Sequence, residues 1–309
     1  MAEQALGEFD FIRWLRGRVP ADPLVRVGVG DDAAAVANRS DATLVTTDML
    51  VGGTHFDTAE ATPRQVGWKA LACSVSDIAA MGGEGTAAVV SAALPDGFGR
   101  AQARDLVEGM LACCEAFGLR LVGGDLTGTR GPLTLSVTVL GDTGDRPPIL
   151  RGGARPGDAV MVTGALGGSL LGRHLRFRPR QAEGLILSRR YRPHAMIDVS
   201  DGLAIDLHHI LEESGVGAAL RAETIPIADD ARRAAAQSGR TPLDHALGDG
   251  EDYELLFTMD LATAERLVDA QPFDVPVRRI GTIVASGATL ILGDGSEREL
   301  RPSGWEHFA

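Results

Sequence analysis

Six short acidic motifs, most of them flanked by glycine, carry the side chains with the clearest chemistry. Carboxylate and hydroxyl oxygens are the hard ligands that suit magnesium and the phosphates that travel with it. Two bare carboxylates about 4 Å apart repel by roughly 4 kcal/mol at an effective dielectric near 20, so acids that converged would need cations. Spacing permits such convergence without requiring it, and a single Gly-Asp pair is typical of a plain turn. The motifs are Gly30-Asp31-Asp32, Thr46-Thr47-Asp48, Ser76-Asp77, Gly123-Gly124-Asp125, Asp198-Val199-Ser200-Asp201 and Gly250-Glu251-Asp252.

The basic residues exclude one common way of binding nucleotide phosphates. Lys69 is the only lysine, so the Gly-Lys-Ser/Thr ending of a phosphate-binding loop cannot occur. Residues 28–33 and 83–88 formally match the dinucleotide pattern G-x-G-x-x-A. The first places two carboxylates where a pyrophosphate should approach bare amides, and the second has no strand leading into it. If this protein handles nucleotide phosphates, it does so with acids, metal, glycine amides and arginine.

Three positions have both a structural and a functional interpretation. Ser200 or Asp201 could simply cap the helix that follows, but the segment supplies three oxygens and a cap explains one, so we favour capping together with ligand binding. His55 lies in a glycine loop just after Asp48, where an ordinary surface histidine and a contact to an anionic substrate are both possible. Arg151 is either a solvated linker residue or a bidentate phosphate clamp.

The elements that must position these motifs alternate between strand and helix. Helical spacing places Asp77 on the apolar face of its helix, where a carboxylate requires a partner. The alternation predicts a mixed α/β fold with the motifs where strands end or helices begin. The expected elements include strands at 43–47, 86–94, 120–122, 133–140, 159–163, 195–198, 253–259, 276–283 and 288–292, and helices at 62–81, 100–117, 181–190, 202–214 and 261–270.

Length and composition bound the class of protein. A chain of 309 residues can form two domains, and a linker near 141–148 divides it into 1–145 and 146–309. The net charge of −12 argues against nucleic acid or an anionic membrane surface as a partner. Early acids and the lack of a long apolar run predict neither a signal peptide nor a membrane span. Three cysteines without a Cys-x-x-Cys pair indicate reduced thiols in a cytoplasmic protein.

Taken together and in this order, the motifs resemble those of the thiamine-monophosphate kinase family. The match runs from Gly7-Glu8-Phe9 to Trp305-Glu306-His307-Phe308, nearly the whole chain. It includes the segments from Thr47 to Phe56, from Ser76 to Gly82, from Asp198 to Leu203 and from Gly250 to Leu255. Two positions depart from the family pattern, because Asp249 stands where a second glycine is common and Leu126 where threonine is typical.

The resemblance implies a two-domain fold of the aminoimidazole-ribonucleotide-synthetase superfamily, whose N-terminal sheet pairs across a homodimer. It implies ATP-dependent phosphorylation of thiamine monophosphate to thiamine diphosphate, assisted by several magnesium ions. Because the attacking phosphate oxygen is already ionised at neutral pH, we predict direct in-line transfer with no covalent or general-base residue. By the same resemblance the magnesium ligands are Asp32, Thr46, Thr47, Asp48, Asp77, Asp125, Asp198 and Asp201; the ATP contacts are Gly124, Asp125, Arg151 and Ser200; and the substrate contacts are His55, Glu251 and Trp305.

Two rival functions stay open at this stage. An ATP-dependent ligase or cyclo-ligase of the same superfamily, acting on a purine-precursor ribonucleotide, would share the acidic phosphate site but not use His55 and Trp305 as substrate contacts. A non-catalytic nucleotide sensor would bind ATP without turnover and would tolerate Asp48→Asn or Asp125→Asn.

Overall fold

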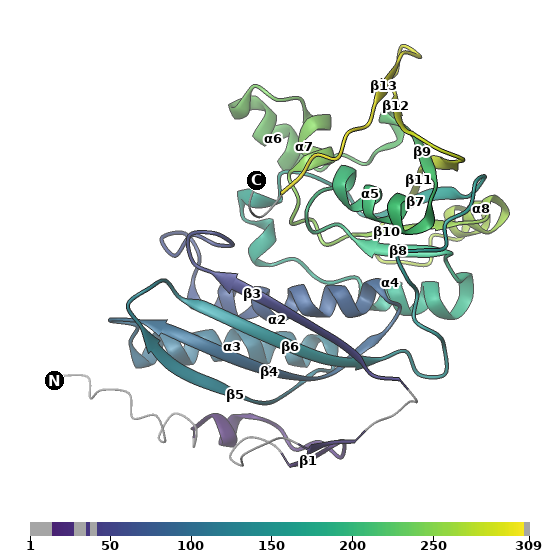
Figure 1. Ribbon diagram of the computed structural model, residues 1–309. Helices are drawn as coiled ribbons and strands as arrows, with labels where there is room; N and C mark the ends of the chain where they lie inside the picture. The colour runs from purple at the N-terminus through teal and green to yellow at the C-terminus, as the bar shows by residue number, and fades with distance from the viewer. Residues whose placement is uncertain (1–13, 28–34, 38–41, 306–309) are drawn as a thin grey trace. The chain divides into compact units, whose positions relative to one another are not determined.

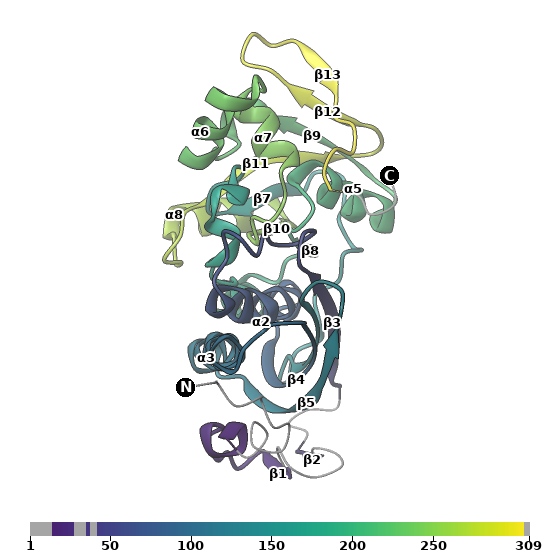
Figure 2. The same ribbon diagram turned by 90° about the vertical axis from the view of Figure 1, so that its left-hand side faces the viewer.

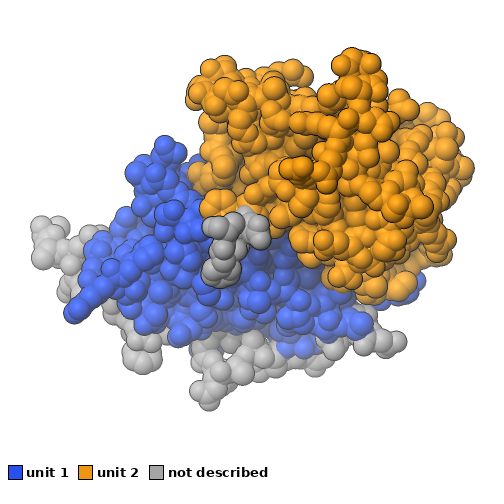
Figure 3. All heavy atoms as spheres, turned by 45° about the horizontal axis from the view of Figure 1, so that its top comes forward, with its two compact units in different colours: residues 1–78, 84–145 blue, residues 79–83, 146–309 orange. Residues whose placement is uncertain are grey.

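The chain forms two compact units in a computed structural model that describes residues 14–27, 35–37 and 42–305. The first unit comprises residues 1–78 and 84–145, and the second comprises residues 79–83 and 146–309 (Figure 3). Among the described residues, no helix combines the length and the apolar composition that crossing a membrane requires.

The first unit is built on a four-stranded sheet with the strand order β3-β6-β4-β5. Two long helices, α2 and α3, cover one face of this sheet, as the views in Figures 1 and 2 agree. A separate pair of short strands, β1 and β2, lies earlier in the chain. The bounds are β1 Val25–Val27, β2 Ala35–Val36, β3 Leu44–Val51, α2 Pro63–Ala80, β4 Glu84–Pro95, α3 Arg100–Phe117, β5 Arg120–Thr129 and β6 Thr134–Asp142.

Helices α2 and α3 approach each other closely because each carries a glycine at the contact. A Cβ atom on Gly67 would lie 2.0 Å from the carbonyl oxygen of Leu106, and one on Gly109 would lie 1.9 Å from that of Arg64. No other residue fits at either position without separating the helices. The close contact fixes α2, which supplies several of the site residues described below.

The second unit contains a seven-stranded sheet with the order β13-β12-β9-β11-β7-β10-β8, in which only β9 and β12 pair in parallel. Its strands are β7 Ala159–Thr163, β8 Ala195–Asp198, β9 Gly217–Arg221, β10 Leu255–Met259, β11 Val277–Val284, β12 Ala288–Ile291 and β13 Glu297–Glu299. Its helices are η1 Ser169–Leu171, η2 Arg173–Leu175, α4 Gln181–Ile186, η3 Leu187–Tyr191, α5 Leu203–Ser214, η4 Ala222–Thr224, α6 Asp229–Ser238, α7 Pro242–Gly248 and α8 Leu261–Ala270.

Both faces of this second sheet are covered, so its central strands β7 and β10 are buried along their whole length and are mostly apolar. Val160 of β7 packs in one core with Leu207 of α5. The next residue along the strand, Met161, packs in a second core with Leu267 of α8. Successive residues of a strand point to opposite faces, which explains why β7 is buried along its whole length.

Two of the acidic motifs lie within strands, contrary to the prediction that they follow strand ends. Strand β3 continues through Asp48 to Val51, and β5 continues through Gly123-Gly124-Asp125 to Thr129. Cross-strand pairing overrides the turn preference of glycine and aspartate here, because Asp48 pairs with Val137 and Gly124 with Val90. The segment from Asp198 to Gly202 does connect a strand to a helix, as predicted.

Candidate functional site

The first cluster of predicted metal ligands lies at the contact between strand β3 and helix α2. Asp48 is half-buried, and its carboxylate accepts a hydrogen bond from the Ser74 hydroxyl of α2. Burial raises the pKa of Asp48, and the bond from Ser74 offsets part of that shift. An ionised Asp48 is therefore costly in the protein alone and would gain from a nearby cation.

A second contact joins the same two elements one turn further along the helix. The Thr46 hydroxyl donates to the Asp77 carboxylate with an oxygen–oxygen distance of 2.5 Å. The prediction that Asp77 needs a partner on the apolar side of its helix is confirmed, since that partner is Thr46. Two of the predicted metal ligands thus hydrogen-bond to each other in the described structure.

Other predicted metal ligands of the first unit lie on its sheet, where residues that pair across the strands form rows. Asp125 is exposed, and the register places it on the row of Ser91, Ser136 and Met49, next to the row of Asp48. Adjacent rows present their side chains to opposite faces, so the Asp48 and Asp125 carboxylates point away from each other.

Thr47 is also exposed; its hydroxyl donates to the Val137 carbonyl at 2.9 Å and accepts from the Thr138 hydroxyl at 3.2 Å. A Cβ on Gly124 would lie 2.0 Å from the Val90 carbonyl oxygen, which explains the glycine. Asp32 lies outside the described residues.

His55 occupies a tight turn directly after β3. Its backbone N–H donates to the Val51 carbonyl at 2.9 Å, and its ring Nδ1 accepts from the Val51 N–H at 3.0 Å. Gly53 adopts a φ of +84°, which favours glycine at this point of the turn. A cavity of about 460 Å³ borders the turn, with Phe56 and Phe98 among its walls.

The acidic turn of the second unit joins β8 to α5. Asp198 is buried, whereas Ser200 and Asp201 are half-buried. The carboxylate of Asp206 accepts from the backbone N–H groups of Asp201 and Gly202, at 3.1 and 3.0 Å. The Asp206 side chain therefore binds the free N–H groups at the start of α5. The described hydrogen bonds do not support the prediction that Ser200 or Asp201 also caps this helix.

Three carboxylates of this turn influence one another. Burial is the main cause that raises the pKa of Asp206 well above its usual range, and the charges of Asp198 and Asp201 raise it further. The second unit thus holds a concentration of negative charge at this turn, for which a cation would be the natural partner. Sequence reasoning missed Asp206, although its position in the first turn of a helix after an acidic motif was a usable signal.

Glu251 lies in a loop whose backbone is unusual. Gly250, Glu251 and Tyr253 have φ values of +71°, +57° and +52°. Positive φ is strained for the two residues that carry side chains, and such strain is found most often at functional sites. The loop is held by N–H bonds from Glu251 to the Ser200 carbonyl at 2.6 Å and from Tyr253 to the Val199 carbonyl at 2.7 Å.

Trp305 reaches the same part of the second unit through its backbone. Its N–H donates to the Asp201 carbonyl at 2.9 Å, while its side chain is 51% exposed. A Cβ on the preceding Gly304 would lie 2.4 Å from that same carbonyl oxygen, so the close approach requires glycine. The structure therefore brings together Ser200, Asp201, Glu251 and Trp305 within one unit.

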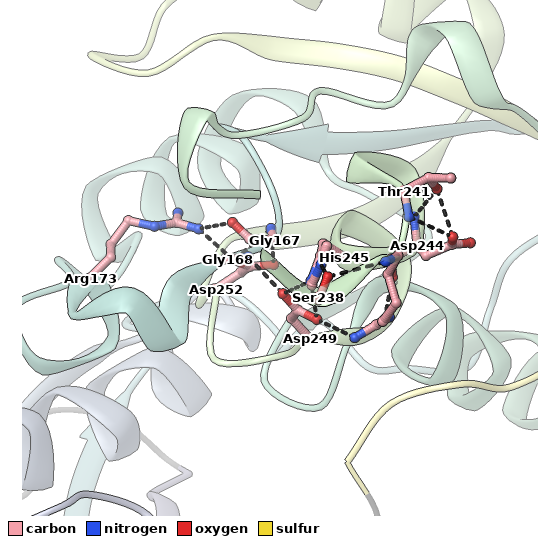
Figure 4. Close-up of polar contacts among 10 residues, drawn as sticks. Gly167, Gly168, Arg173, Ser238, Thr241, Asp244, His245, Asp249 and Asp252 are labelled. Carbon is pink, nitrogen blue, oxygen red and sulfur yellow. Dashed lines mark hydrogen bonds and ion pairs between the residues drawn. The ribbon is translucent and has the colours of Figure 1, made fainter. Parts of the chain in front are cut away.

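A buried polar network supports the Glu251 loop (Figure 4). The Asp252 carboxylate accepts from the Gly167 N–H at 2.9 Å and from the Arg173 guanidinium at 2.7 Å. Burial raises the pKa of Asp252 to about 7, even though the Arg173 charge lowers it. Sequence spacing could not identify this pair, because its members are far apart in the chain.

Asp249, one of the two departures from the family pattern, belongs to the same network. Its carboxylate accepts from the Gly168 N–H at 3.0 Å and from Arg240 at 2.9 Å, and it contacts His245 Nδ1 at 2.7 Å (Figure 4). The charge that Asp249 adds near Glu251 is thus compensated by its own partners. The other residue predicted to bind ATP in this unit, Arg151, is exposed.

The donor types suit magnesium, though not as an enclosed protein cage. In the described part of the chain, no three His, Cys, Asp or Glu side chains gather as a metal-binding group. Magnesium is commonly held by one or two carboxylates together with water and substrate phosphates, so such a cage is not required. The Asp48 carboxylate in the first unit fits that mode of binding, and so do the Asp198 and Asp201 carboxylates in the second unit.

Comparison with known proteins identifies the family. Residues 30–143 match the model of the AIR synthase related protein N-terminal domain, and residues 159–292 match that of the C-terminal domain. Thiamine-monophosphate kinase of Rhodopirellula baltica is 41% identical over 309 residues, covering 97% of each chain. This chain belongs to the thiamine-monophosphate kinase family.

Two solved structures extend the similarity to three dimensions. The thiamine-monophosphate kinase of Stenotrophomonas maltophilia K279a is 34% identical, with a TM-score of 0.82 over 94% of this chain and 98% of its own. AaThiL complexed with AMPPCP and TMP is 31% identical, with a TM-score of 0.77 over 98% and 97%. The mixed α/β fold with two synthetase-like domains, predicted from the motifs, is confirmed by these thiamine-monophosphate kinase relatives.

Proposed function

We propose that this chain transfers the γ-phosphoryl group of ATP to thiamine monophosphate, forming thiamine diphosphate and ADP. The observation that carries the proposal is full-length kinship, at 41% identity over 97% of the chain, with a thiamine-monophosphate kinase. A relative complexed with AMPPCP and TMP supports ATP and thiamine monophosphate as the two substrates. Three buried free cysteines are compatible with a reducing, cytoplasmic setting.

The acids of both units contribute to phosphate binding in this proposal. The contacts around Asp48 and Asp77, and the charge at the Asp198–Asp201 turn, support these residues as parts of two magnesium-binding segments. The proposed ligands are Asp32, Thr46, Thr47, Asp48, Asp77, Asp125, Asp198 and Asp201. The proposed ATP contacts are Gly124, Asp125, Arg151 and Ser200, and the proposed thiamine monophosphate contacts are His55, Glu251 and Trp305.

Phosphoryl transfer requires the protein mainly to position the two substrates and to compensate the negative charge of their phosphate oxygens. The attacking group is a phosphate oxygen that is already ionised at neutral pH, so no general base is required. Magnesium, when bound, would neutralise the phosphate oxygens and reduce the repulsion between the two anionic substrates. The side chains of this chain bind and orient the two phosphates, and Trp305 offers an aromatic face to a thiamine ring. Transfer is then direct and in line, without a phosphorylated protein.

The exposed face of the first sheet supports a homodimer. Val45 and Met49 of β3 and Val89 of β4 are 65%, 59% and 38% exposed, although all three are large apolar residues; β6 lies between these two strands. Such a patch is characteristic of a protein interface. We propose that this sheet pairs with a second copy, and that residues 1–145 carry dimerisation and the metal and ATP contacts while residues 146–309 form the second synthetase-like domain.

The test is incubation of the purified protein with magnesium, ATP and thiamine monophosphate, followed by chromatography. We expect thiamine diphosphate and ADP in equal amounts. ADP formed without thiamine diphosphate would favour the ligase alternative, and ATP binding without turnover would favour the nucleotide sensor.

The in-line step has its own measurement. Transfer from ATP made chiral at the γ-phosphorus with oxygen isotopes should invert the configuration, because a single displacement occurs. Retention, or radioactive phosphate that stays on the protein, would indicate a phosphoenzyme and contradict direct transfer.

A further inference from the structure

Lys69 combines a unique identity with an unusual environment. It is the only lysine in the chain, and its side chain on α2 is 1% exposed. Lysine is almost never fully buried unless its ammonium group has a specific partner, because desolvation of the charge is costly. A buried lysine in a chain that otherwise uses arginine therefore indicates a position that requires the compact, multiply donating ammonium group.

Lys69 is bonded to the turn that carries His55. The Lys69 Nζ donates to the His55 backbone carbonyl with a nitrogen–oxygen distance of 2.6 Å. The same turn is closed by bonds from the Thr54 and His55 N–H groups to the Val51 carbonyl, at 3.1 and 2.9 Å. Lys69 thus connects the His55 turn to helix α2, while the bonds to Val51 connect this turn to strand β3.

This contact completes a series of three between α2 and the β3 segment. Ser74 holds Asp48, and Asp77 holds Thr46, as described above. As the helix advances from Lys69 to Asp77, its partners step back along the chain from residue 55 to residue 46. One helix face therefore sets the position of two proposed metal-binding residues and of the proposed substrate histidine.

We propose that Lys69 is a positioning residue for recognition of thiamine monophosphate, acting through the His55 turn; this inference rests on the proposed function. Nδ1 of His55 accepts a backbone hydrogen bond, so the neutral ring carries its hydrogen on Nε2, which can donate to an anion. Because these bonds fix the turn, they also fix the direction in which the Nε2–H donor of His55 points. Misplacement of a substrate-positioning group by about 1 Å can cost about 100-fold in rate, so the anchor matters for function as well as stability.

Steady-state kinetics of Lys69→Met test the role in substrate recognition, because methionine retains the length of the side chain and removes the donor. We expect KM for thiamine monophosphate to rise about tenfold, because the His55 donor loses the bond that fixes its turn, with KM for ATP within about twofold of the wild-type value. Lys69→Arg should restore part of the loss. On a His55→Ala background, Lys69→Met should add little, since the group that it positions is already absent.

Thr86→Val is the matched control for these kinetics. The Thr86 hydroxyl is buried in the same unit and donates to the Leu140 carbonyl at 3.0 Å, so the substitution also removes a buried side-chain bond to a carbonyl. Its KM for thiamine monophosphate should not change. An unchanged KM in Lys69→Met, or additive effects of Lys69→Met and His55→Ala, would overturn the proposal even if the wild-type protein makes thiamine diphosphate.

Chemical labelling of the wild-type protein tests the same contact without any substitution. The chain has one lysine side chain, so acetylation by acetic anhydride at Lys69 can be quantified by mass spectrometry of its peptide. We expect slow modification in the native protein and at least threefold slower modification with saturating thiamine monophosphate, but not with ATP alone. An equal rate with and without thiamine monophosphate would overturn the proposal.

Discussion

The backbone N–H of Trp305 donates to the carbonyl of Asp201 across 2.9 Å. This bond attaches the end of the described chain to the acidic turn of the second unit and leaves the indole ring half exposed. This bond is made by the backbone of Trp305 and does not involve the indole ring. Substitutions of the ring therefore test ligand binding rather than the attachment of the segment.

Trp305→Ala should raise KM for thiamine monophosphate about tenfold, because it removes a stacking surface worth about 0.5–1.5 kcal/mol beyond the buried area. Trp305→Phe should retain most of the affinity, since an aromatic face remains. Steady-state kinetics with each substrate varied in turn provide the measurement. Equal changes in KM for ATP and for thiamine monophosphate would contradict a specific role for the ring.

Asp48→Asn should stabilise the metal-free protein while lowering activity by at least about 100-fold. Burial raises the pKa of Asp48, so its ionised form is costly at neutral pH, and asparagine removes the charge but keeps an acceptor for Ser74. Denaturant unfolding with and without magnesium measures both effects. A variant that is less stable than wild type without magnesium, yet equally stabilised by magnesium, would refute this account of Asp48.

His55→Gln and His55→Asn should differ, because the two amides imitate different ring nitrogens. Asparagine can accept from the Val51 N–H as Nδ1 does, but it does not reach outward, whereas glutamine can place a donor near the Nε2 position. We expect a smaller rise of KM for thiamine monophosphate in His55→Gln than in His55→Asn. The reverse order would show that the Nδ1 contact, and not the outward donor, carries substrate recognition.

The stability contribution of Asp252 should decrease as the pH rises. Its folded-state pKa is about 7, above the ordinary value of 3.8, so between pH 4 and 7 the folded protein holds a proton that the unfolded chain has lost. The folded state is therefore favoured at the lower pH, and this advantage is lost as the pH rises through about 7.

Urea unfolding of wild type and Asp252→Asn from pH 5 to 8 isolates this effect. The free energy of unfolding of wild type, minus that of the variant, should decrease over this range and level off above about pH 7. A difference that is constant or grows with pH would mean that the bonds from Gly167 and Arg173 keep Asp252 ionised.

The sequence predicts the elements that have strong local signals. Thr62-Pro63 predicts the start of α2, and Gly118, in the left-handed region at φ +69°, ends α3 where the pattern predicts. Helix α6 was not predicted, because the residues on its inner face are alanines and only Ala231 among them is buried, which makes the apolar signal weak. The acidic motifs in β3 and β5 were placed at strand ends because turn composition is local, whereas strand pairing is not.

For the candidate site too, the sequence predicts what depends on neighbouring residues and not what depends on residues far apart in the chain. The identity of the motif residues could be predicted, since glycine and acids at fixed spacing have a chemical meaning. Their supporting partners could not be, because Lys69 with His55 and Arg173 with Asp252 are paired only by the fold. The uniqueness of Lys69 was visible in the sequence, but nothing in the spacing indicated its partner.

The most direct measurement is the rate of thiamine diphosphate formation by wild type, Asp48→Asn, Asp198→Asn and the control Asp158→Asn. Asp158 and Asp198 are both 4% exposed in the second unit, but Asp158 instead accepts from Arg155 N–H at 2.9 Å and contacts His194. The account predicts magnesium-dependent product from wild type and from Asp158→Asn, with losses of at least about 100-fold in Asp48→Asn and Asp198→Asn. Wild-type rates in either of those two variants would contradict the proposed role of that carboxylate in phosphoryl transfer.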